Sequence, residues 1–134
     1  MAGMGDSEEI VEIGIREVDE EHRVQFRLLA GIQQEVESSH RENVLTLLQQ
    51  LYDYSAAHFA TEQTFMRLHS YPARQAHERE HEELLYELKA LLEAARISES
   101  IDIQGWPQAI RRWLQSHINT SDLAYGKWVR DRQH

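Results

Sequence analysis

The sequence predicts an all-α fold, an antiparallel up-down four-helix bundle with an N-terminal extended arm. Long stretches lack helix breakers, because only 2 prolines and 6 glycines occur among 134 residues. Within these stretches the apolar residues recur every three or four positions, which is the period of one buried helix face. The links between the stretches are short and polar, and short links favour antiparallel neighbouring helices.

The first half of the chain is expected to form the arm and two helices. Residues 1–18 are expected to lie on the bundle as the arm, with Ile13 and Ile15 as anchors. Asp19 suits a helix N-cap, so the first helix is expected over about 19–37. The second is expected over about 41–68 and ends before Pro72, because proline disfavours helical geometry in the residue before it.

The second half is expected to form the other two helices. The third is expected over about 73–97, with leucines such as Leu84 and Leu88 facing inward. A polar link follows, and Pro107 suits the first turn of a last helix over about 107–130. A chain of 134 residues has the length of one ordinary domain, so residues 1–134 are predicted to form a single domain.

The composition excludes several classes of function. The chain has no cysteine, which rules out disulfides, thiolate metal sites and cysteine nucleophiles. Its 23 acidic and 14 basic residues give a net charge of -9, which argues against binding to nucleic acid. No segment has the roughly 18 consecutive apolar residues that span a membrane, and no signal peptide is apparent. A cytoplasmic protein without a membrane partner is therefore expected.

Polar residues on the inner helix faces form the most informative pattern. The chain has 8 histidines, and several share a face with the apolar core residues. Four-residue spacing puts pairs on one face of the second and third helices, while the first and last helices carry one inward histidine each. The inward set is His22, His58, Glu62, His77, His81 and His117. Asp122 lies five residues after His117, about 140° around an ideal helix, so it reaches the set only if the helix is deformed or the side chain extends sideways.

This polar cluster predicts a metal site. A single histidine on an apolar face is more often a hydrogen-bonded core residue than a ligand. Five histidines with a glutamate reverse that expectation, because burying them without partners costs several kcal/mol each. Nitrogen and oxygen donors without sulfur suit iron, zinc, manganese or copper.

The number of donors favours two metal ions. Five imidazoles and two carboxylates are too many for one ion of six coordinates. If both carboxylates bridge and one oxygen atom is shared, eleven of the twelve positions of two octahedra are filled. The remaining position is a vacancy for a small ligand.

The spacing of these residues along the chain resembles the hemerythrin family, specifically its bacterial branch. The similarity begins at Gly14 and covers nearly all of the chain after it. It is carried by Val18-Asp19-Glu20-Glu21-His22, His58-Phe59-Ala60-Thr61-Glu62, Tyr71-Pro72, His77, His81, Trp113, His117-Ile118 and Asp122. Each short motif is weak alone, but H-x3-E, H-x3-H and H-x4-D on successive helices are jointly specific.

The resemblance implies a ligand set and a function. One iron would be held by His77, His81 and His117, and the other by His22 and His58. The two iron ions (Fe2+/Fe3+) would be bridged by Glu62, Asp122 and an oxo or hydroxo group. Dioxygen would bind reversibly at the open position of the two-histidine iron, and Ile118 would wall the oxygen pocket. Such a protein stores, delivers or senses oxygen and is not an enzyme.

Three alternatives stay open from the sequence. Residues 77–81 also fit the H-E-x-x-H zinc-peptidase pattern with Glu78 as general base, although no strand is predicted to hold a peptide. A ferritin-like di-iron oxidase or ferroxidase would use Glu-x-x-His motifs, which Glu78 and His81 match and Asp19 and His22 nearly match. A nitric oxide or redox sensor would need a signalling module or redox partner outside this chain.

Overall fold

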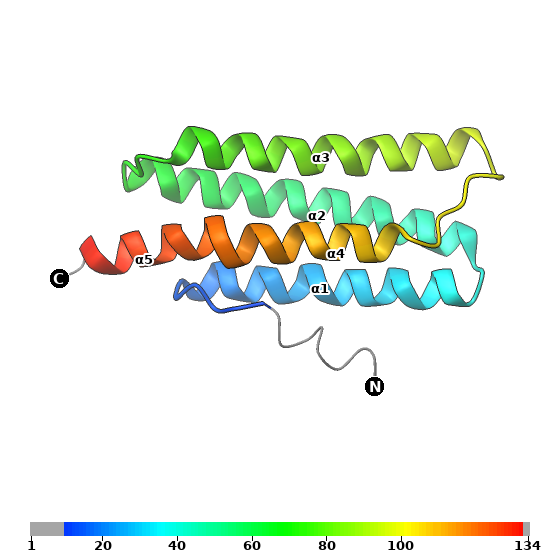
Figure 1. Cartoon of the computed structure of the whole chain (residues 1–134), viewed down its shortest axis with the longest axis horizontal. Helices are drawn as coiled ribbons and strands as arrows, with labels where there is room; N and C mark the ends of the chain where they lie inside the picture. The colour runs from blue at the N-terminus through cyan, green and yellow to red at the C-terminus, as the bar shows by residue number, and fades with distance from the viewer. Residues whose placement is uncertain (1–9, 133–134) are drawn as a thin grey trace.

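The computed structural model describes residues 10–132, and over this range it is helical without strands. Four helical rods lie side by side in Figure 1, and consecutive rods run in opposite directions. The first three rods are α1 (Arg16–Glu37), α2 (Arg41–Leu68) and α3 (Arg74–Ile97). The fourth consists of α4 (Trp106–His117), a π-helical segment η2 (Ile118–Asp122) and α5 (Leu123–Arg132). The predicted four-helix bundle is confirmed.

The first helix begins earlier than the sequence predicted. It starts at Arg16, and Asp19 is not its N-cap, because the backbone N–H of Asp19 already donates to the carbonyl of Ile15 at 2.9 Å. The Asp19 carboxylate instead accepts the backbone N–H groups of Ile13 at 2.8 Å and Gly14 at 3.2 Å. Asp19 therefore fixes the arm to the helix.

The arm, of which residues 10–15 are described, also buries one apolar side chain against the bundle. Ile13 is fully buried and packs against Val18 and Ile118. Its carbonyl accepts a hydrogen bond from Arg130 at 3.0 Å, and a Cβ atom on Gly126 would overlap that carbonyl. The absence of a side chain at Gly126 thus allows the arm to approach α5. Residues 1–9 of the predicted arm lie outside the described residues.

The last rod differs from the continuous α-helix that the sequence predicted over about 107–130. It extends from Trp106 to Arg132, and five of its residues are π-helical. In a π-helix the backbone hydrogen bond spans five residues instead of four, so the turn is wider. Isolated π-helical turns inside α-helices often occur at functional sites. The third helix begins at Arg74, one residue after the predicted start.

The apolar core divides into one large cluster and two small ones. The large cluster fills the half of the bundle near the α1–α2 turn and includes Leu29, Ile32, Val36, Val44, Leu48, Leu51, Leu88, Leu92 and Leu114. The small clusters lie toward the other end, one around Ile13 and the other around Met66 and Tyr125. Along α2, the polar residues His58 and Glu62 lie between Leu51 of the large cluster and Met66 of a small one. None of the described helices is both long and apolar enough to cross a bilayer.

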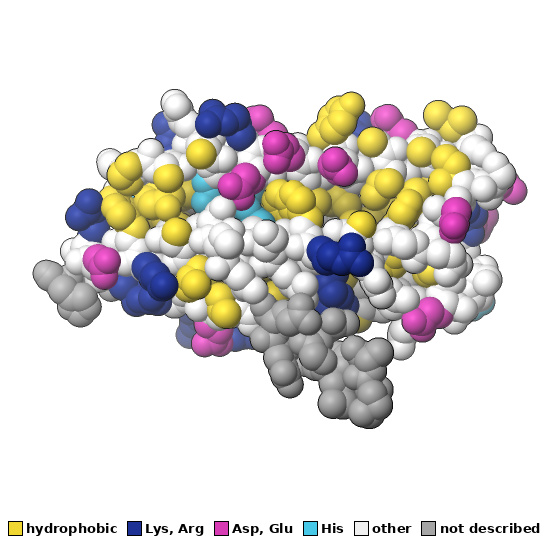
Figure 2. Space-filling view, in the orientation of Figure 1, with side chains coloured by type: hydrophobic (Ala, Val, Ile, Leu, Met, Phe, Trp, Pro, Cys, Tyr) yellow, Lys and Arg dark blue, Asp and Glu magenta, His cyan; other side chains and the backbone are white. Residues whose placement is uncertain are grey.

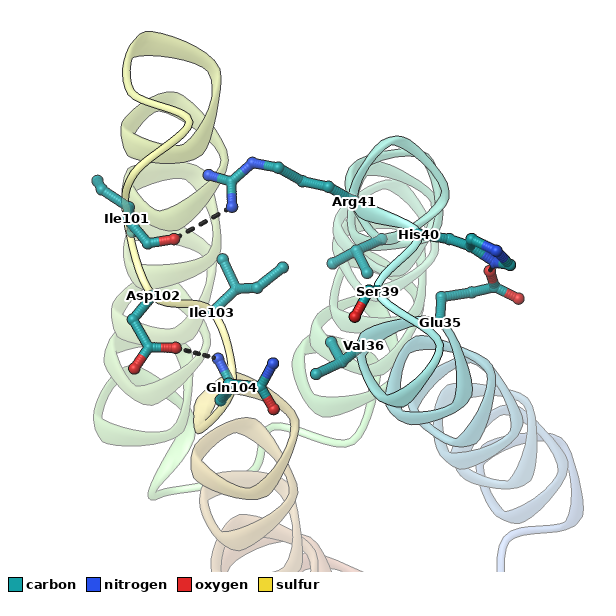
Figure 3. Close-up of a pocket in the computed structure, with 10 residues that line it drawn as sticks. Glu35, Val36, Ser39, His40, Arg41, Ile101, Asp102, Ile103 and Gln104 are labelled. Atoms are coloured by element: carbon teal, nitrogen blue, oxygen red, sulfur yellow. Dashed lines mark hydrogen bonds and ion pairs between the residues drawn. The ribbon is translucent and has the colours of Figure 1, made fainter.

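Arg41 closes the end of the bundle at which the α1–α2 turn and the α3–α4 link lie (Figure 3). Its guanidinium donates to the carbonyls of Ile101 at 3.1 Å and Ser98 at 2.9 Å, which ties the α3–α4 link to the start of α2. A pocket of about 230 Å³ lies beside this link. Nδ1 of His40, in the lining of this pocket, lies 2.9 Å from Oε1 of Glu35, and the two side chains are hydrogen-bonded at the surface.

Candidate metal centre

All seven predicted ligands are buried together in the bundle. None is more than 3% exposed, although all seven carry polar or charged side chains. They come from every rod: His22 from α1, His58 and Glu62 from α2, His77 and His81 from α3, His117 from the end of α4, and Asp122 from the end of η2. In Figure 2, histidine side chains are visible in a small area in the left half of the view, beside apolar and acidic side chains.

The ligand atoms form two groups that share the two carboxylates. Within each group, the candidate donor atoms all lie within 4.8 Å of one another. The first group is Glu62, His77, His81, His117 and Asp122, and the second is His22, His58, Glu62 and Asp122. Three imidazoles therefore belong to one side and two to the other, with Glu62 and Asp122 between them. This arrangement fits two metal ions with bridging carboxylates.

The two oxygens of Asp122 face different groups. Oδ1 lies 2.8 Å from Nε2 of His77 and 3.2 Å from Nε2 of His117. Oδ2 lies 3.0 Å from Nε2 of His22 in the other group. Oε1 of Glu62 lies 3.0 Å from Nε2 of both His77 and His81, its Oε2 is buried without a partner, and Glu62 belongs to both groups. Each carboxylate can thus offer one oxygen to each of two ions.

The π-helical segment explains how Asp122 reaches the cluster. On an ideal α-helix Asp122 would lie about 140° around the axis from His117. The wider turn of η2 brings residues five apart onto nearly the same face, as a normal turn does for residues four apart. The helix is therefore deformed at the point where the predicted ligand set requires it.

Several buried polar atoms of the cluster have no hydrogen-bond partner within the protein. They are His22 Nδ1 and Nε2, His58 Nε2, Glu62 Oε2, and Asp122 Oδ1 and Oδ2. The Asp122 oxygens lie close to imidazole nitrogens, but these contacts are not directed hydrogen bonds. An unsatisfied buried polar atom costs about 1–3 kcal/mol, so native proteins contain few of them. Their concentration between the two groups fits metal ions, which would use these lone pairs.

Hydrogen bonds from outside the cluster orient three of the imidazoles. The Nδ1–H group of His58 donates to Glu21 at 2.6 Å, and that of His117 donates to Glu80 at 2.6 Å. His81 Nδ1 lies 2.8 Å from the side-chain oxygen of Gln63. With the proton on Nδ1, the lone pair of Nε2 faces the cluster, as metal binding requires.

Glu21, Gln63 and Glu80 were not identified from the sequence. Glu21 and Glu80 each lie 37 residues from the histidine they bind, and Gln63 lies 18 residues from His81. Each bond joins two helices, so no spacing rule within one helix reveals it. Each of the three directly precedes or follows a predicted ligand, but Glu78 and Glu82 do so too, and this signal therefore does not single them out.

Aromatic rings hold two of the imidazoles by stacking. Phe59 lies on His81 with ring centroids 3.9 Å apart and an angle of 4° between the planes. Trp113 lies on His117 with centroids 4.9 Å apart and an angle of 14°. Rings packed in this way restrict rotation of the imidazoles about their side-chain bonds. The ligand directions are therefore fixed by packing as well as by hydrogen bonds.

The charges within the cluster shift several pKa values. Burial and the Asp122 carboxylate raise the pKa of Glu62, but hydrogen bonds from His77 and His81 outweigh them and leave it below its ordinary value. Burial likewise opposes the ionised form of Asp122, yet neighbouring imidazoles, His117 foremost, hold its pKa well below the usual range. Burial lowers the pKa of His77, but Asp122 and Glu62 raise it to about 10. For His81, burial dominates and the pKa falls.

The raised pKa of His77 predicts that metal binding releases a proton. In the metal-free protein this imidazole is protonated between the two carboxylates. Its contribution to the free energy of unfolding is complete below pH 6.5 and is lost as the pH rises through the folded-state pKa of about 10. A metal ion must displace that proton, so its affinity is expected to rise about tenfold per pH unit between pH 7 and 9. Zinc titration by calorimetry in buffers of different ionisation enthalpy measures the release. An affinity independent of pH over this range would contradict the assignment of His77.

The carboxylates that the alternative sites require lie outside both groups. Glu78, the general base of the zinc-peptidase reading, pairs with Arg74 at 3.2 Å and Arg67 at 3.5 Å. Asp19, which a ferritin-like site would direct inward, binds the backbone of the arm.

Ile118 is fully buried and packs with Ile13 and Val18. Its role in an oxygen pocket stays a prediction.

Comparisons with known proteins agree with this geometry. Residues 13–129 match the family model of the hemerythrin HHE cation binding domain. A bacteriohemerythrin of Stenotrophomonas maltophilia (strain R551-3) is 30% identical over 118 residues, which is 88% of this chain and 76% of that protein. A bacteriohemerythrin of Methylococcus capsulatus is 28% identical over 81% of this chain and 82% of its own length.

A solved structure shows the same fold. It is a crystal structure of a leucine-to-phenylalanine mutant, with a TM-score of 0.81 and 25% sequence identity. The alignment covers 85% of this chain and 87% of the other. The family model, the relatives and the shared fold together show that the chain belongs to the hemerythrin HHE cation-binding family.

Proposed function

We propose that this protein binds dioxygen reversibly at a non-heme di-iron centre. His77, His81 and His117 would hold one iron, and His22 and His58 the other. Glu62 and Asp122 would bridge the two ions, together with an oxo or hydroxo group. The family match and the relatives named bacteriohemerythrin support iron and oxygen as the cargo. The two groups of donor atoms that share these carboxylates support a pair of ions.

The asymmetry of the two groups is the observation that carries the proposal. One group has three imidazoles and the other has two, while both share the same carboxylates. With equal bridging, the two-histidine side has one donor fewer, and that difference favours an open coordination position there. The iron pair would supply two electrons and the position where dioxygen binds. The side chains of the protein supply the geometry and the exclusion of water.

The surroundings of the site favour binding over oxidation of a substrate. Five neutral imidazoles and two carboxylates are less anionic than the carboxylate-rich shell of ferritin-like sites, so they stabilise highly oxidised iron less. The hydrogen bonds to Glu21, Gln63 and Glu80 fix the ligand directions. We therefore infer a binding protein, not an enzyme. Its location in the cytoplasm and any signalling or redox partner stay predictions from the sequence.

Oxygenation of the reduced protein tests the proposal directly. Two irons per chain are expected by metal analysis. A visible absorption band should appear when the colourless reduced protein meets air, and it should fade when oxygen is removed, over repeated cycles. Irreversible conversion to an oxidised form without such a band would favour a ferroxidase or oxidase instead. Finding one zinc and no iron would exclude both di-iron functions.

A further inference from the structure

Tyr125 is a buried phenol just beyond the candidate metal centre. It follows Asp122 by one helical turn and is fully buried. It packs against Met66, which itself follows Glu62 by one turn of α2. The side chain therefore lies in the apolar cluster next to both bridging carboxylates. Nothing in the proposed oxygen binding requires a phenol at this place.

The hydroxyl of Tyr125 has a base as its partner. The phenolic oxygen lies 2.7 Å from Nδ1 of His69, at the exposed C-terminal end of α2. A buried O–H group needs an acceptor, so the phenol donates to Nδ1 and the imidazole carries its own proton on Nε2. Burial raises the pKa of Tyr125, so the phenol keeps its proton at ordinary pH. The proton is thus held by Tyr125, and a base is already placed to accept it.

A row of aromatic rings connects Tyr125 with the surface. The ring of Tyr71 lies 4.9 Å from Tyr125 between centroids, and the ring of Trp128 lies 5.3 Å from Tyr71. Trp128 is partly exposed, and the guanidinium of Arg132 lies 4.3 Å from its ring centroid. Tyrosine and tryptophan are the side chains most readily oxidised by one electron in a chain without cysteine. These three rings lie in close succession from the core to the surface, and such an arrangement is suited to electron transfer.

We propose that Tyr125, Tyr71 and Trp128 form a redox relay that lets oxidising equivalents leave the metal centre, with His69 as the proton acceptor. The relay rests on the proposed function for its oxidant, a metal pair oxidised by hydrogen peroxide. When an oxidised metal pair is bound, Tyr125 would give up one electron to it, the O–H bond would break, and the proton would move to Nδ1 of His69. An ascorbate-type donor at the surface then supplies one electron through Trp128 and Tyr71. His69 returns the proton, which restores the phenol.

The consequence is protection of the ligand histidines. An oxidised metal pair without a nearby electron source would oxidise its own imidazoles or neighbouring side chains. Through the relay, an external reductant supplies electrons to the metal pair one at a time, so the ligand imidazoles are not oxidised. The bond between Tyr125 and His69 is essential, because an oxidised phenol becomes a strong acid and a buried one must lose its proton to a nearby base.

The relay can be tested without iron, in the full chain loaded with redox-inert zinc. Because the chain has no cysteine, Asp131→Cys offers a single attachment point for a photosensitiser, one turn from Trp128. A flash-generated oxidant there should produce a neutral tyrosyl radical on Tyr125, detected by electron paramagnetic resonance. Tyr125→Phe should abolish that signal, while Tyr86→Phe, at a tyrosine 76% exposed on α3, should leave it unchanged.

Two further variants separate the relay from simple accessibility. His69→Gln keeps a hydrogen-bond acceptor but removes the base, so the rate of radical formation should fall roughly a hundredfold and its solvent isotope effect should disappear. A sensitiser on Glu99→Cys, in the α3–α4 link at the other end of the bundle (Figure 1), should give no Tyr125 radical. A radical on another residue, or an unchanged rate in His69→Gln, would overturn the relay.

The iron form then distinguishes the relay from the proposed function. With peroxide and iron, wild type should retain its ligand histidines by mass spectrometry when ascorbate is present, whereas Tyr125→Phe should show their oxidation. Failure of the zinc experiment overturns the relay and leaves oxygen binding untouched. Failure of reversible oxygenation together with a Tyr125 radical in the zinc protein overturns the proposed function, whereas the electron and proton path through Trp128, Tyr71, Tyr125 and His69 stays supported.

Discussion

Replacing Glu62 with glutamine is expected to leave the protein with at most one of its two metal ions. Glu62 is fully buried and belongs to both groups of donor atoms. Its Oε1 lies 3.0 Å from His77 and His81, and its Oε2 has no hydrogen-bond partner in the protein. The amide has nearly the same shape but no charge. It therefore removes one bridging anion from between two cations without opening a cavity.

Glu78→Gln provides the matched control for this prediction. Glu78 is also a glutamate and directly follows the predicted ligand His77 in the sequence. Its carboxylate, however, pairs with Arg74 and Arg67 and belongs to neither group of donor atoms. The control should retain two irons per chain by metal analysis and the oxygenation band of wild type. Circular dichroism should show that both variants remain helical. If Glu78→Gln lost the metals and Glu62→Gln retained them, the assignment of faces on α2 and α3 would be wrong.

Removing the metal ions is expected to lower the stability of the fold by several kcal/mol. A ligand that binds only the folded state stabilises it by about 4 kcal/mol when its concentration is a thousandfold above the dissociation constant. In addition, metal removal leaves buried imidazole and carboxylate atoms without partners, at about 1–3 kcal/mol each. For a chain of this size, we expect the melting temperature to fall by at least about 10 °C.

Thermal unfolding of the metal-loaded and chelator-treated protein measures this difference. Adding the chelator to protein that is already free of metal controls for effects of the chelator itself. Restoring ferrous iron without oxygen should recover the original melting temperature. A metal-free form that melts at the same temperature as the loaded form would show that the cluster is satisfied by its own ion pairs, such as the one between His77 and Asp122.

The sequence determined the helices and most of the candidate site, because both depend on local spacing. The 3.6-residue period places His58 with Glu62, and His77 with His81, on inward faces of their helices. Breaker residues and short links determine the order of the rods and favour antiparallel packing. The helix ends were less certain: Asp19 looked like an N-cap, yet it holds the arm, because the choice between these partners depends on where the arm lies. The prediction of one domain over the whole chain stays a prediction.

Only the tertiary structure decided how Asp122 and the supporting groups take part. A five-residue spacing misses the inward face of an α-helix, and the π-helical segment η2 brings Asp122 onto it. An even helical period does not predict that deformation, and one side chain of the segment, Ser121, donates to Glu80 of another helix at 2.8 Å. The hydrogen bonds to Glu21 and Glu80 likewise join residues 37 positions apart. The sequence by itself determined which side chains turn inward, and packing between helices decided which of their atoms face one another.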